Sequence, residues 1–309
     1  MLSTIIRRLL QGFIVICAIT IITFIMLRMI PGDPSRTMAP NATEDQLIML
    51  RDQMGINDPI MVQLSKYIRN IFQGELGYSF FQRADVVKVI AGSLNASIIL
   101  FGFALALSIF FGLLFGIIAA LKANTWIDKL ISSIAVIFQS MPNYWVGIML
   151  ILLISVKLKL LPATGYDGFK FAILPGIVLS LPTIAVLMRN VRASMISSLR
   201  QDFVKAAKAR GIPGYISLSR YAFRNSLIPL LTLLGSQLGY MVGNMVVCEY
   251  VFSYPGIGLQ TLYAILRRDY YLVQGLVVIL SGFFIIVNMI IDIGYIYLDP
   301  RIRKAQGGL

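Results

Sequence analysis

The chain has 309 residues, of which 58% are hydrophobic and only 13% are charged, and its formal net charge is +13. A soluble domain of this length would expose far too much apolar surface, so the composition excludes a soluble globular class and indicates a polytopic membrane protein. The sequence contains no His, which removes the most common general base and metal ligand. Cys17 and Cys248 both lie in apolar surroundings, and we interpret them as small core residues and not as a disulfide.

The first apolar run extends from Leu9 to Leu27 and follows Arg7 and Arg8. At about 1.5 Å per residue, this run is long enough to cross about 30 Å of hydrocarbon. A signal peptide is the alternative, but its hydrophobic region would be shorter and would end in a small-residue cleavage site. This run ends instead in L-R-M-I-P-G-D-P. We therefore predict a retained first span with the N-terminus inside.

The composition becomes mixed between Pro31 and about Ser93. Thr43 is a candidate N-cap for an amphipathic helix over residues 43–54, and residues 61–72 predict a second such helix. We therefore predict that residues 1–93 comprise the first transmembrane helix and a small extracytoplasmic domain.

Five further apolar runs follow, at residues 94–121, 130–156, 171–188, 227–250 and 272–298. Six spans place both termini in the cytoplasm, with a membrane core over 94–299 that includes a long loop at 189–226, and a tail at 300–309. Most of the excess positive charge then lies on the inner side, as the positive-inside rule expects. We therefore attribute the basic excess to topology and to contact with membrane lipid, and not to nucleic-acid binding.

Several polar residues lie within the predicted spans. Asp292 is the one acid that we place well inside a span; it is either part of a proton relay or, in the interpretation we prefer, paired with an Arg or Lys of the inner side. Gln139, Asn143, Gln237 and Asn244 are candidates for a polar translocation path, although hydrogen bonds between helices explain them equally well.

Small residues and Pro recur in the same spans. Gly112 and Gly116 are four residues apart, as in helices that approach one another closely, and Pro142 predicts a kink in the third run. This pattern suits a bundle that moves, and it is equally compatible with packing alone.

The loop at 189–226 contains eight Lys and Arg against one acid, Asp202, so it must lie in water between two spans. Gly211 followed by Pro213 predicts the end of a short amphipathic helix. The apolar stripe of this helix is predicted to comprise Met195, Leu199, Phe203, Ala206 and Ala207. Such a helix can lie on lipid headgroups or dock onto another protein.

The string F-V-K-A-A-K-A-R-G at 203–211, followed by R-N-S-L-I-P at 224–229, resembles the cytoplasmic "EAA" loop of binding-protein-dependent ABC importer permeases, specifically of the peptide/nickel branch. The resemblance extends along nearly the whole chain. Besides the L-R-M-I-P-G-D-P string, it includes G-I-N-D-P-I at 55–60, G-E-L-G-Y-S-F at 74–80, S-M-P-N-Y-W at 140–145, L-P-A-T-G-Y at 161–166, E-Y-V-F-S-Y-P-G-I-G at 249–258, R-D-Y at 268–270 and L-D-P-R-I-R at 298–303.

The resemblance implies an all-α, type I ABC importer permease fold with six transmembrane helices in the bacterial inner membrane. It also implies four kinds of partner: a second homologous permease, two cytoplasmic ATPases that bind ATP and Mg, an extracytoplasmic binding protein, and lipid. The implied cargo is a di- or oligopeptide, with nickel, a nickel chelate or glutathione as the alternatives. The residues implied to couple the chain to the ATPase are Asp202, Phe203, Lys205, Ala206, Ala207 and Gly211.

In such a system the chain itself is not an enzyme, binds no cofactor and holds no metal. No G-x-x-x-x-G-K-[ST] motif occurs in it, so ATP hydrolysis falls to the partners. Lys205 stands where the family name has Glu, and Phe203 would supply an apolar contact. Two other classes remain: a secondary transporter, for which Asp292 alone is thin support, and an intramembrane hydrolase, which one intramembrane acid and the lack of His make improbable.

Overall fold

The computed structural model describes the chain except residues 1, 34, 37–38, 40, 217–222 and 299–309. In addition, the side chains of residues 2–5, 7, 208, 215, 224–229, 231–232 and 292–298 are not described. The predicted tail at 300–309, part of the loop at 189–226 and the side chain of Asp292 therefore lie outside the description.

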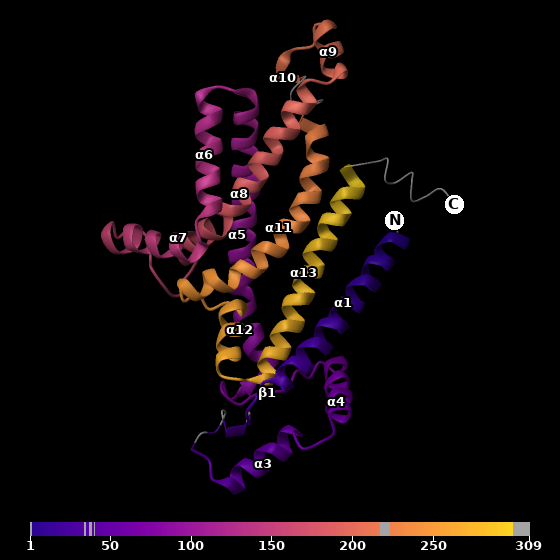
Figure 1. The fold of residues 1–309 in the computed structure, drawn as a ribbon, viewed down its shortest axis with the longest axis vertical. Coiled ribbons are helices and arrows are strands. Elements are labelled where there is room, and N and C mark those ends of the chain that lie inside the picture. Colours follow the sequence, from indigo (N-terminus) through magenta and orange to yellow (C-terminus); the bar gives the residue numbers. More distant parts are fainter. Residues whose placement is uncertain (1, 34, 37–38, 40, 217–222, 299–309) are drawn as a thin grey trace. The chain divides into compact units, whose positions relative to one another are not determined.

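The described chain is almost entirely helical, as expected for an all-α fold (Figure 1). A short hairpin of β1 (Tyr78–Ser79) and β2 (Ala84–Asp85) is antiparallel, with Tyr78 opposite Asp85. The helices, in chain order, are α1 (Leu2–Met29), α3 (Glu44–Met54), α4 (Ile60–Phe72), α5 (Val86–Leu121), α6 (Trp126–Ser140), α7 (Asn143–Leu150), the π-helix η1 (Ile151–Lys157), α8 (Lys170–Leu199), α9 (Asp202–Ala209), α10 (Gly214–Ile216), α11 (Arg224–Val251), α12 (Ile257–Leu266) and α13 (Tyr270–Leu298).

Four helices in the described part of the chain are long and apolar enough to cross a membrane: α1, α5, α8 and α13. The pair formed by α6 and α7–η1 adds a fifth candidate if the two halves count as one span. Helix α11 has 28 residues but does not join the candidates, and its length includes the polar side chains of Ser236, Gln237, Asn244 and Glu249. The count of six spans therefore stays a prediction.

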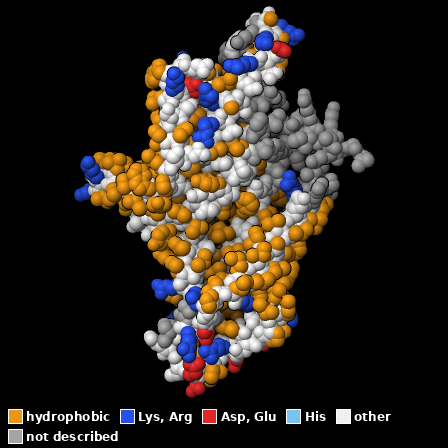
Figure 2. All heavy atoms as spheres, viewed as in Figure 1, with side chains coloured by type: hydrophobic (Ala, Val, Ile, Leu, Met, Phe, Trp, Pro, Cys, Tyr) orange, Lys and Arg blue, Asp and Glu red, His pale blue; other side chains and the backbone are white. Residues whose placement is uncertain are grey.

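The apolar side chains of α1, α5 and α13 remain largely uncovered by the chain itself, whereas 67% of the most apolar window of α8 is buried. Helix α1 exposes Leu10, Ile14 and Met26, among others, and only 11% of its most apolar window is buried. On the face shown in Figure 2, hydrophobic side chains cover the surface of α7, whereas Lys and Arg gather over α9. Apolar surface of this extent requires lipid or partner helices as its environment.

The third apolar run is not the single helix that its length predicted. Helix α6 ends at Ser140, and α7 begins at Asn143 after a bend of 103°. Pro142 is the N-cap of α7, a position that Pro tolerates because its missing N–H would have no helical partner there. The run is therefore a broken span or a re-entrant loop.

By its internal contacts the chain divides into two compact units, one of Met1–Ser97 with Pro255–Ile285 and the other of Ile98–Tyr254 with Ile286–Leu309. The first unit contains the two helices predicted after the first span. At the start of α3 the backbone N–H of Thr43 donates to the Gln46 side chain at 3.0 Å. Gly55 ends α3 with φ of +62°, and the N–H of Ile56 reaches back to the carbonyl of Arg51. The helix predicted to start at Thr43 is therefore confirmed, whereas the cap at Gly55 was not predicted.

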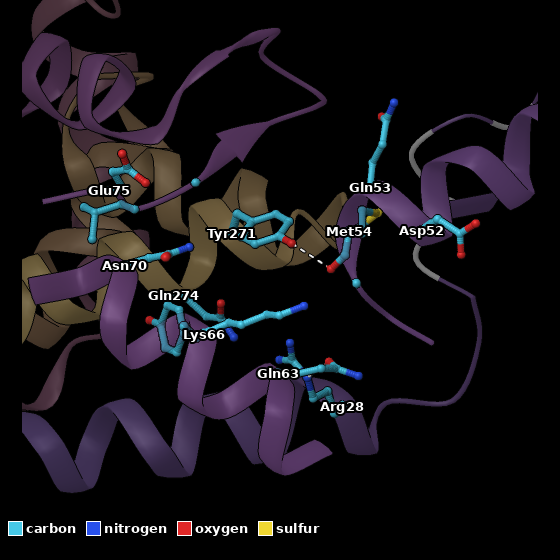
Figure 3. Close-up of a pocket in the computed structure, with 14 residues that line it drawn as sticks. Arg28, Asp52, Gln53, Met54, Gln63, Lys66, Asn70, Glu75, Tyr271 and Gln274 are labelled. Carbon is cyan, nitrogen blue, oxygen red and sulfur yellow. Dashed lines mark hydrogen bonds between the residues drawn. The ribbon is translucent and has the colours of Figure 1, made fainter. Parts of the chain in front are cut away.

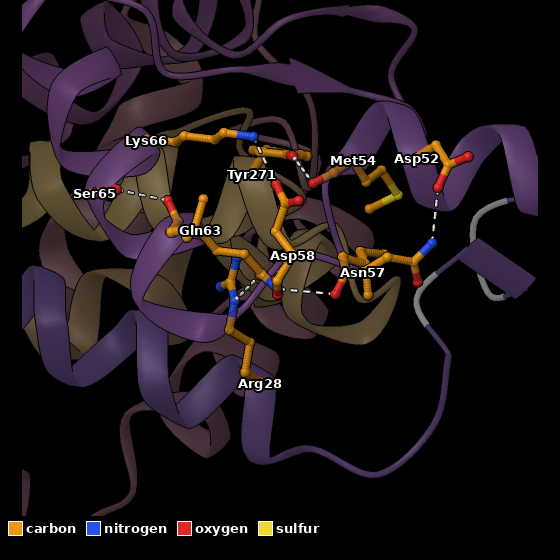
Figure 4. A network of polar contacts seen from close by, with 11 residues as sticks. Arg28, Asp52, Met54, Asn57, Asp58, Gln63, Ser65, Lys66 and Tyr271 are labelled. Atoms are coloured by element: carbon orange, nitrogen blue, oxygen red, sulfur yellow. Dashed lines mark hydrogen bonds and ion pairs between the residues drawn. The ribbon is translucent and has the colours of Figure 1, made fainter.

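Polar side chains join the segments of the first unit (Figure 4). Arg28, in the last turn of α1, donates to Gln63 of α4 at 2.7 Å, and the Gln63 amide in turn donates to the carbonyls of Ile56 and Asp58. The hydroxyl of Tyr271, at the start of α13, donates to the carbonyl of Met54. These contacts fix α3 and α4 against the ends of two apolar helices.

Close approach between α5 and α8 organises the second unit. A Cβ atom added at Gly112 would lie 2.7 Å from Leu187, and one added at Gly116 would lie 2.6 Å from Val191. The small residues predicted to permit close helix packing therefore do so. Gly102 of the same helix has nothing within 4 Å of the added atom.

We predict that Gly116→Ala destabilises the protein by about 1–3 kcal/mol, because the new methyl group must displace Val191 and the α8 backbone. Gly102→Ala is the matched control: it should be neutral or stabilising, since Ala is the better helix former. Thermal unfolding of both variants in the same detergent checks this expectation, and equal unfolding temperatures would contradict the close packing.

Candidate functional site

The predicted cytoplasmic loop contains a helix, but that helix is shorter than its apolar stripe indicated. Helix α8 continues as far as Leu199, and a turn at Arg200 and Gln201 separates it from α9. Met195 is fully buried in α8, where it packs with Leu187 and Val191. The stripe is therefore divided: its first part belongs to the core of the second unit, and only its second part belongs to α9.

Helix α9 has one face covered by the chain and one face exposed. Val204 and Ala207, three residues apart, are 1% and 4% exposed. Phe203 is 40% exposed, and Asp202, Lys205 and Ala206 are exposed as well. Of the two adjacent alanines implied for coupling, Ala206 is thus available to a partner and Ala207 already packs within the chain.

Gly211 ends the α9 segment as predicted. Its φ is +73°, in the left-handed region, and the N–H of Ile212 reaches back to the carbonyl of Ala207 at 3.1 Å. This is the closing hydrogen bond of a Schellman cap, which needs a residue without a Cβ at the C′ position.

Lys205 forms a local ion pair in place of the contact that a Glu would make. Its Nζ lies 2.9 Å from Oδ1 of Asp202, one turn earlier on α9. Both side chains are well exposed, so solvent screens the pair and it contributes little to stability. The pair does place a cation and an anion side by side on the exposed face of α9.

The four polar candidates for a translocation path separate into a bonded pair and two single residues. The amide of Asn143, at the start of α7, donates to Asn244 of α11 at 2.9 Å, and Asn244 donates to the carbonyl of Tyr240. Gln139 is exposed at the end of α6, and Gln237 is half-buried. Hydrogen bonding between helices therefore explains two of the four, while a role in a path stays a prediction for all of them.

The second unit contains a buried ion pair that was not predicted from the sequence. Asp128 of α6 is 3% exposed, and it accepts from Arg192 of α8 in a two-pronged contact, 2.5 Å from Nε to Oδ1 and 2.7 Å from Nη2 to Oδ2. The backbone N–H of Asn124 also donates to it. Arg192 lies ten residues before α9 begins, so this pair fixes the start of α6 to the part of α8 that leads into the candidate coupling helix.

A second acid also lies within an apolar run. Glu249 is fully buried near the end of α11, two residues before Val251, so Asp292 is not the sole acid inside the predicted spans. Glu249 is the last residue but one of the run at 227–250, so from the sequence it was placed at the edge of the span and not inside it.

Comparison with known proteins identifies the family of this chain. Residues 112–304 match the family described as the binding-protein-dependent transport system inner membrane component, and residues 1–101 match the N-terminal region of such membrane components. The chain belongs to this family. A probable peptide ABC transporter permease of Sinorhizobium fredii is 33% identical over 97% of the chain and 98% of its own length.

Two further relatives cover the permease equally well. A putative peptide transport system permease of Brucella abortus is 34% identical over 98% of the chain and 99% of its own length. The glutathione transport system permease of Escherichia coli (strain K12) is 34% identical over the same shares of the two chains. Permease subunits of ABC importers are not themselves enzymes, and this one is a multi-pass membrane protein by its family and its apolar helices.

The permease fold brings together several of the strings in which the resemblance was found. In the first unit the hydroxyl of Ser79 donates to Asp269 at 2.5 Å, and Arg268 donates to the carbonyl of Pro31. Burial raises the pKa of the Asp269 carboxyl, although the hydrogen bonds from Ser79 and from backbone N–H groups oppose this shift. In the second unit the rings of Tyr166 and Tyr254 meet edge to face at 5.3 Å. Residues of these strings therefore form hydrogen bonds and ring contacts inside each unit, in addition to the exposed face of α9.

We predict that Asp128→Asn destabilises the permease by about 2–3 kcal/mol, because it leaves the Arg192 guanidinium without its counter-ion. The side chain of Arg192 is itself 30% exposed, so the loss of stability lies below that expected for a fully buried pair. Arg192→Lys keeps the charge but loses the two-pronged contact, and should cost less. Arg200→Lys, at an exposed position, is the control. Thermal unfolding in detergent measures all three, and an unchanged Asp128→Asn variant would contradict a structural role for the pair.

Proposed function

We propose that the chain is the transmembrane permease subunit of an ATP-driven importer that translocates di- or oligopeptides delivered by an extracytoplasmic binding protein. The observation that supports this most strongly is similarity over nearly the full length to relatives named as peptide permeases. Similarity of this extent includes both the apolar helices and the candidate coupling loop. Transport proceeds by alternating access of the helical bundle to the two sides of the membrane.

Glutathione is the second candidate cargo. The glutathione permease of Escherichia coli is as similar to this chain as the peptide permeases are. Glutathione is itself a small peptide with free carboxylates, so the two proposals differ in the identity of the cargo and not in the mechanism. Import of nickel or a nickel chelate is the remaining alternative.

The proposed assembly contains a second homologous permease, two cytoplasmic ATPases that bind ATP and Mg, and the binding protein. In it both termini of this chain and helix α9 lie on the cytoplasmic side. The concentration of Lys and Arg in the α9 segment supports this orientation, because short cytoplasmic loops contain an excess of basic residues.

Coupling occurs through the exposed face of α9. In this proposal Phe203 and Ala206 enter a groove on the ATPase, and Asp202 and Lys205 form polar contacts at its edge. The buried residues Val204 and Ala207 hold the helix to its own chain, and Gly211 ends it at a fixed point. Movement of α9 then passes to α8, and through the Asp128–Arg192 contact to α6.

Nucleotide binding must supply the bias between the two states of the bundle. A shift from mostly one state to mostly the other needs about 5.5 kcal/mol of differential affinity. A short helix with a fixed end transmits such a bias better than a flexible loop, because a helix bends less under a displacement of its partner.

We predict that Ala206→Arg abolishes uptake of a labelled dipeptide while the protein still inserts and remains folded. The added side chain obstructs the docking face but leaves the contacts of Val204 and Ala207 in place. Gly211→Pro should have a similar effect, because Pro cannot adopt the positive φ of the cap. Uptake by cells that express each variant in place of the natural chain measures the effect.

Ser197→Arg is the matched control, since it places the same side chain at an exposed position of α8, outside α9. It should retain uptake. Normal dipeptide uptake by both Ala206→Arg and Gly211→Pro would contradict the assignment of α9 as the coupling element. Uptake of glutathione but not of dipeptides by the natural chain would instead favour the second candidate cargo.

A further inference from the structure

The first unit contains two neighbouring cavities with polar walls. One has a volume of about 200 Å³ and the other of about 290 Å³, and Arg28 and Gln63 line both of them. The first cavity is bounded by the end of α1, the turn after α3, one side of α4 and the start of α13 (Figure 3). The hydrogen bond between Arg28 and Gln63 therefore lies in the wall that the two cavities share.

Arg28 brings a positive charge to this wall without a carboxylate partner in the described part of the chain. Its guanidinium donates to Gln63 at 2.7 Å and to the carbonyl of Phe24 at 3.4 Å, and it lies over the Phe24 ring. A guanidinium has five N–H donors, so most of them have no acceptor among the described residues. The C-terminal end of α1 offers about half an elementary negative charge, which offsets the cation only in part.

Gln274 provides a second donor without an acceptor. This residue of α13 lines the first cavity, its side chain is 2% exposed, and its amide nitrogen has no hydrogen-bond partner among the described residues. A buried amide without a partner costs free energy, so such a group indicates a partner that is absent. Two unsatisfied donors, one of them charged, thus line the same cavity.

The acids near the cavity do not satisfy these donors. Asp52 accepts from the side chain of Asn57, and Asp58 accepts from Lys66 at 2.7 Å. In Figure 3 the carboxylates of Glu75 and Asp52 lie at opposite ends of the view, while Lys66 extends between Tyr271 and Arg28. Asp52 and Glu75, the two acids that line this cavity, therefore leave Arg28 and the amide nitrogen of Gln274 without a carboxylate partner in the described part of the chain.

We propose that this cavity binds a carboxylate group, with Arg28 as its cationic partner and Gln274 as an amide donor. The volume of about 200 Å³ is below that of sites for drug-sized ligands, so the occupant is a small molecule or a single side chain. The carboxylate comes either from a free small ligand or from an Asp or Glu side chain of the binding protein. The second source rests on the proposed function. Both sources present the same group to the same donors.

Binding is tested on the complex purified with its partners in lipid nanodiscs. N-acetylglycine is the carboxylate probe and N-acetylglycine amide is its uncharged counterpart, and calorimetry measures the affinity of each. In parallel, the affinity of the co-purifying binding protein for the complex is measured. Arg28→Gln should weaken carboxylate binding about tenfold or more, and Gln274→Leu about fivefold. Arg69→Gln, at an exposed position of α4 outside both cavities, should change nothing.

Gln274→Leu removes a buried amide whose nitrogen has no partner among the described residues, so this variant should fold at least as well as the natural chain. It keeps the test decisive if Arg28→Gln does not fold. Binding of N-acetylglycine but not of the amide, weakened by these variants, supports a free carboxylate ligand. Loss of binding-protein affinity without binding of N-acetylglycine supports a side chain of that protein. If both variants leave both affinities unchanged, or if the amide binds as well as the acid, the proposal is overturned. The N-acetylglycine arm is decisive even if no binding protein exists.

Discussion

The structure depends on one constraint, which is that most of its helical surface must be compatible with hydrocarbon. A backbone in lipid has no water to satisfy its N–H and C=O groups, so long helices are the available form, and the chain provides them in α1, α5, α8 and α13. The polar contacts and the exposed helix α9 are consequently found where an apolar helix ends or breaks. The Arg28–Gln63 hydrogen bond lies at the end of α1, the Asn143–Asn244 contact lies at the break between α6 and α7, and α9 lies beyond the end of α8.

Within the second unit, close contacts connect α5 and α6 to α8. The glycines of α5 admit α8 at van der Waals distance, and the Asp128–Arg192 pair fixes α6 to the same helix. Helix α8 is therefore held on two sides, and in the proposed coupling a displacement of α9 would reach α5 and α6 through these contacts. This arrangement favours a bundle that switches between discrete packings over one that deforms gradually. Helices α6 and α7 both pack against α8, so in this proposal they are the helices that move with it.

Local signals in the sequence were sufficient for the elements they govern. Thr43 and Gly55 mark the two ends of α3, and Gly211 ends α9, because caps depend on a few neighbouring residues. The family and the position of its loop were likewise predictable from strings of residues. The sequence did not reveal the turn at Arg200 and Gln201, because an apolar stripe continues across it. Nor did it reveal the Asp128–Arg192 pair, whose members are 64 residues apart and meet only after folding. The 103° bend at Pro142 exceeded the predicted kink, and the residue that follows Pro142, Asn143, donates to Asn244 of α11.

The central claim is that the exposed face of α9 contacts an ATPase. A photo-crosslinking amino acid placed at Phe203 or Ala206, in cells that express the full transporter, tests this contact directly. We predict a covalent adduct with a protein that contains a P-loop motif, identified by mass spectrometry, and no such adduct when the same amino acid is placed at Ser197. Adducts with lipid alone from positions 203 and 206, in cells that still import the cargo, would contradict the account and would indicate that α9 lies on the membrane surface.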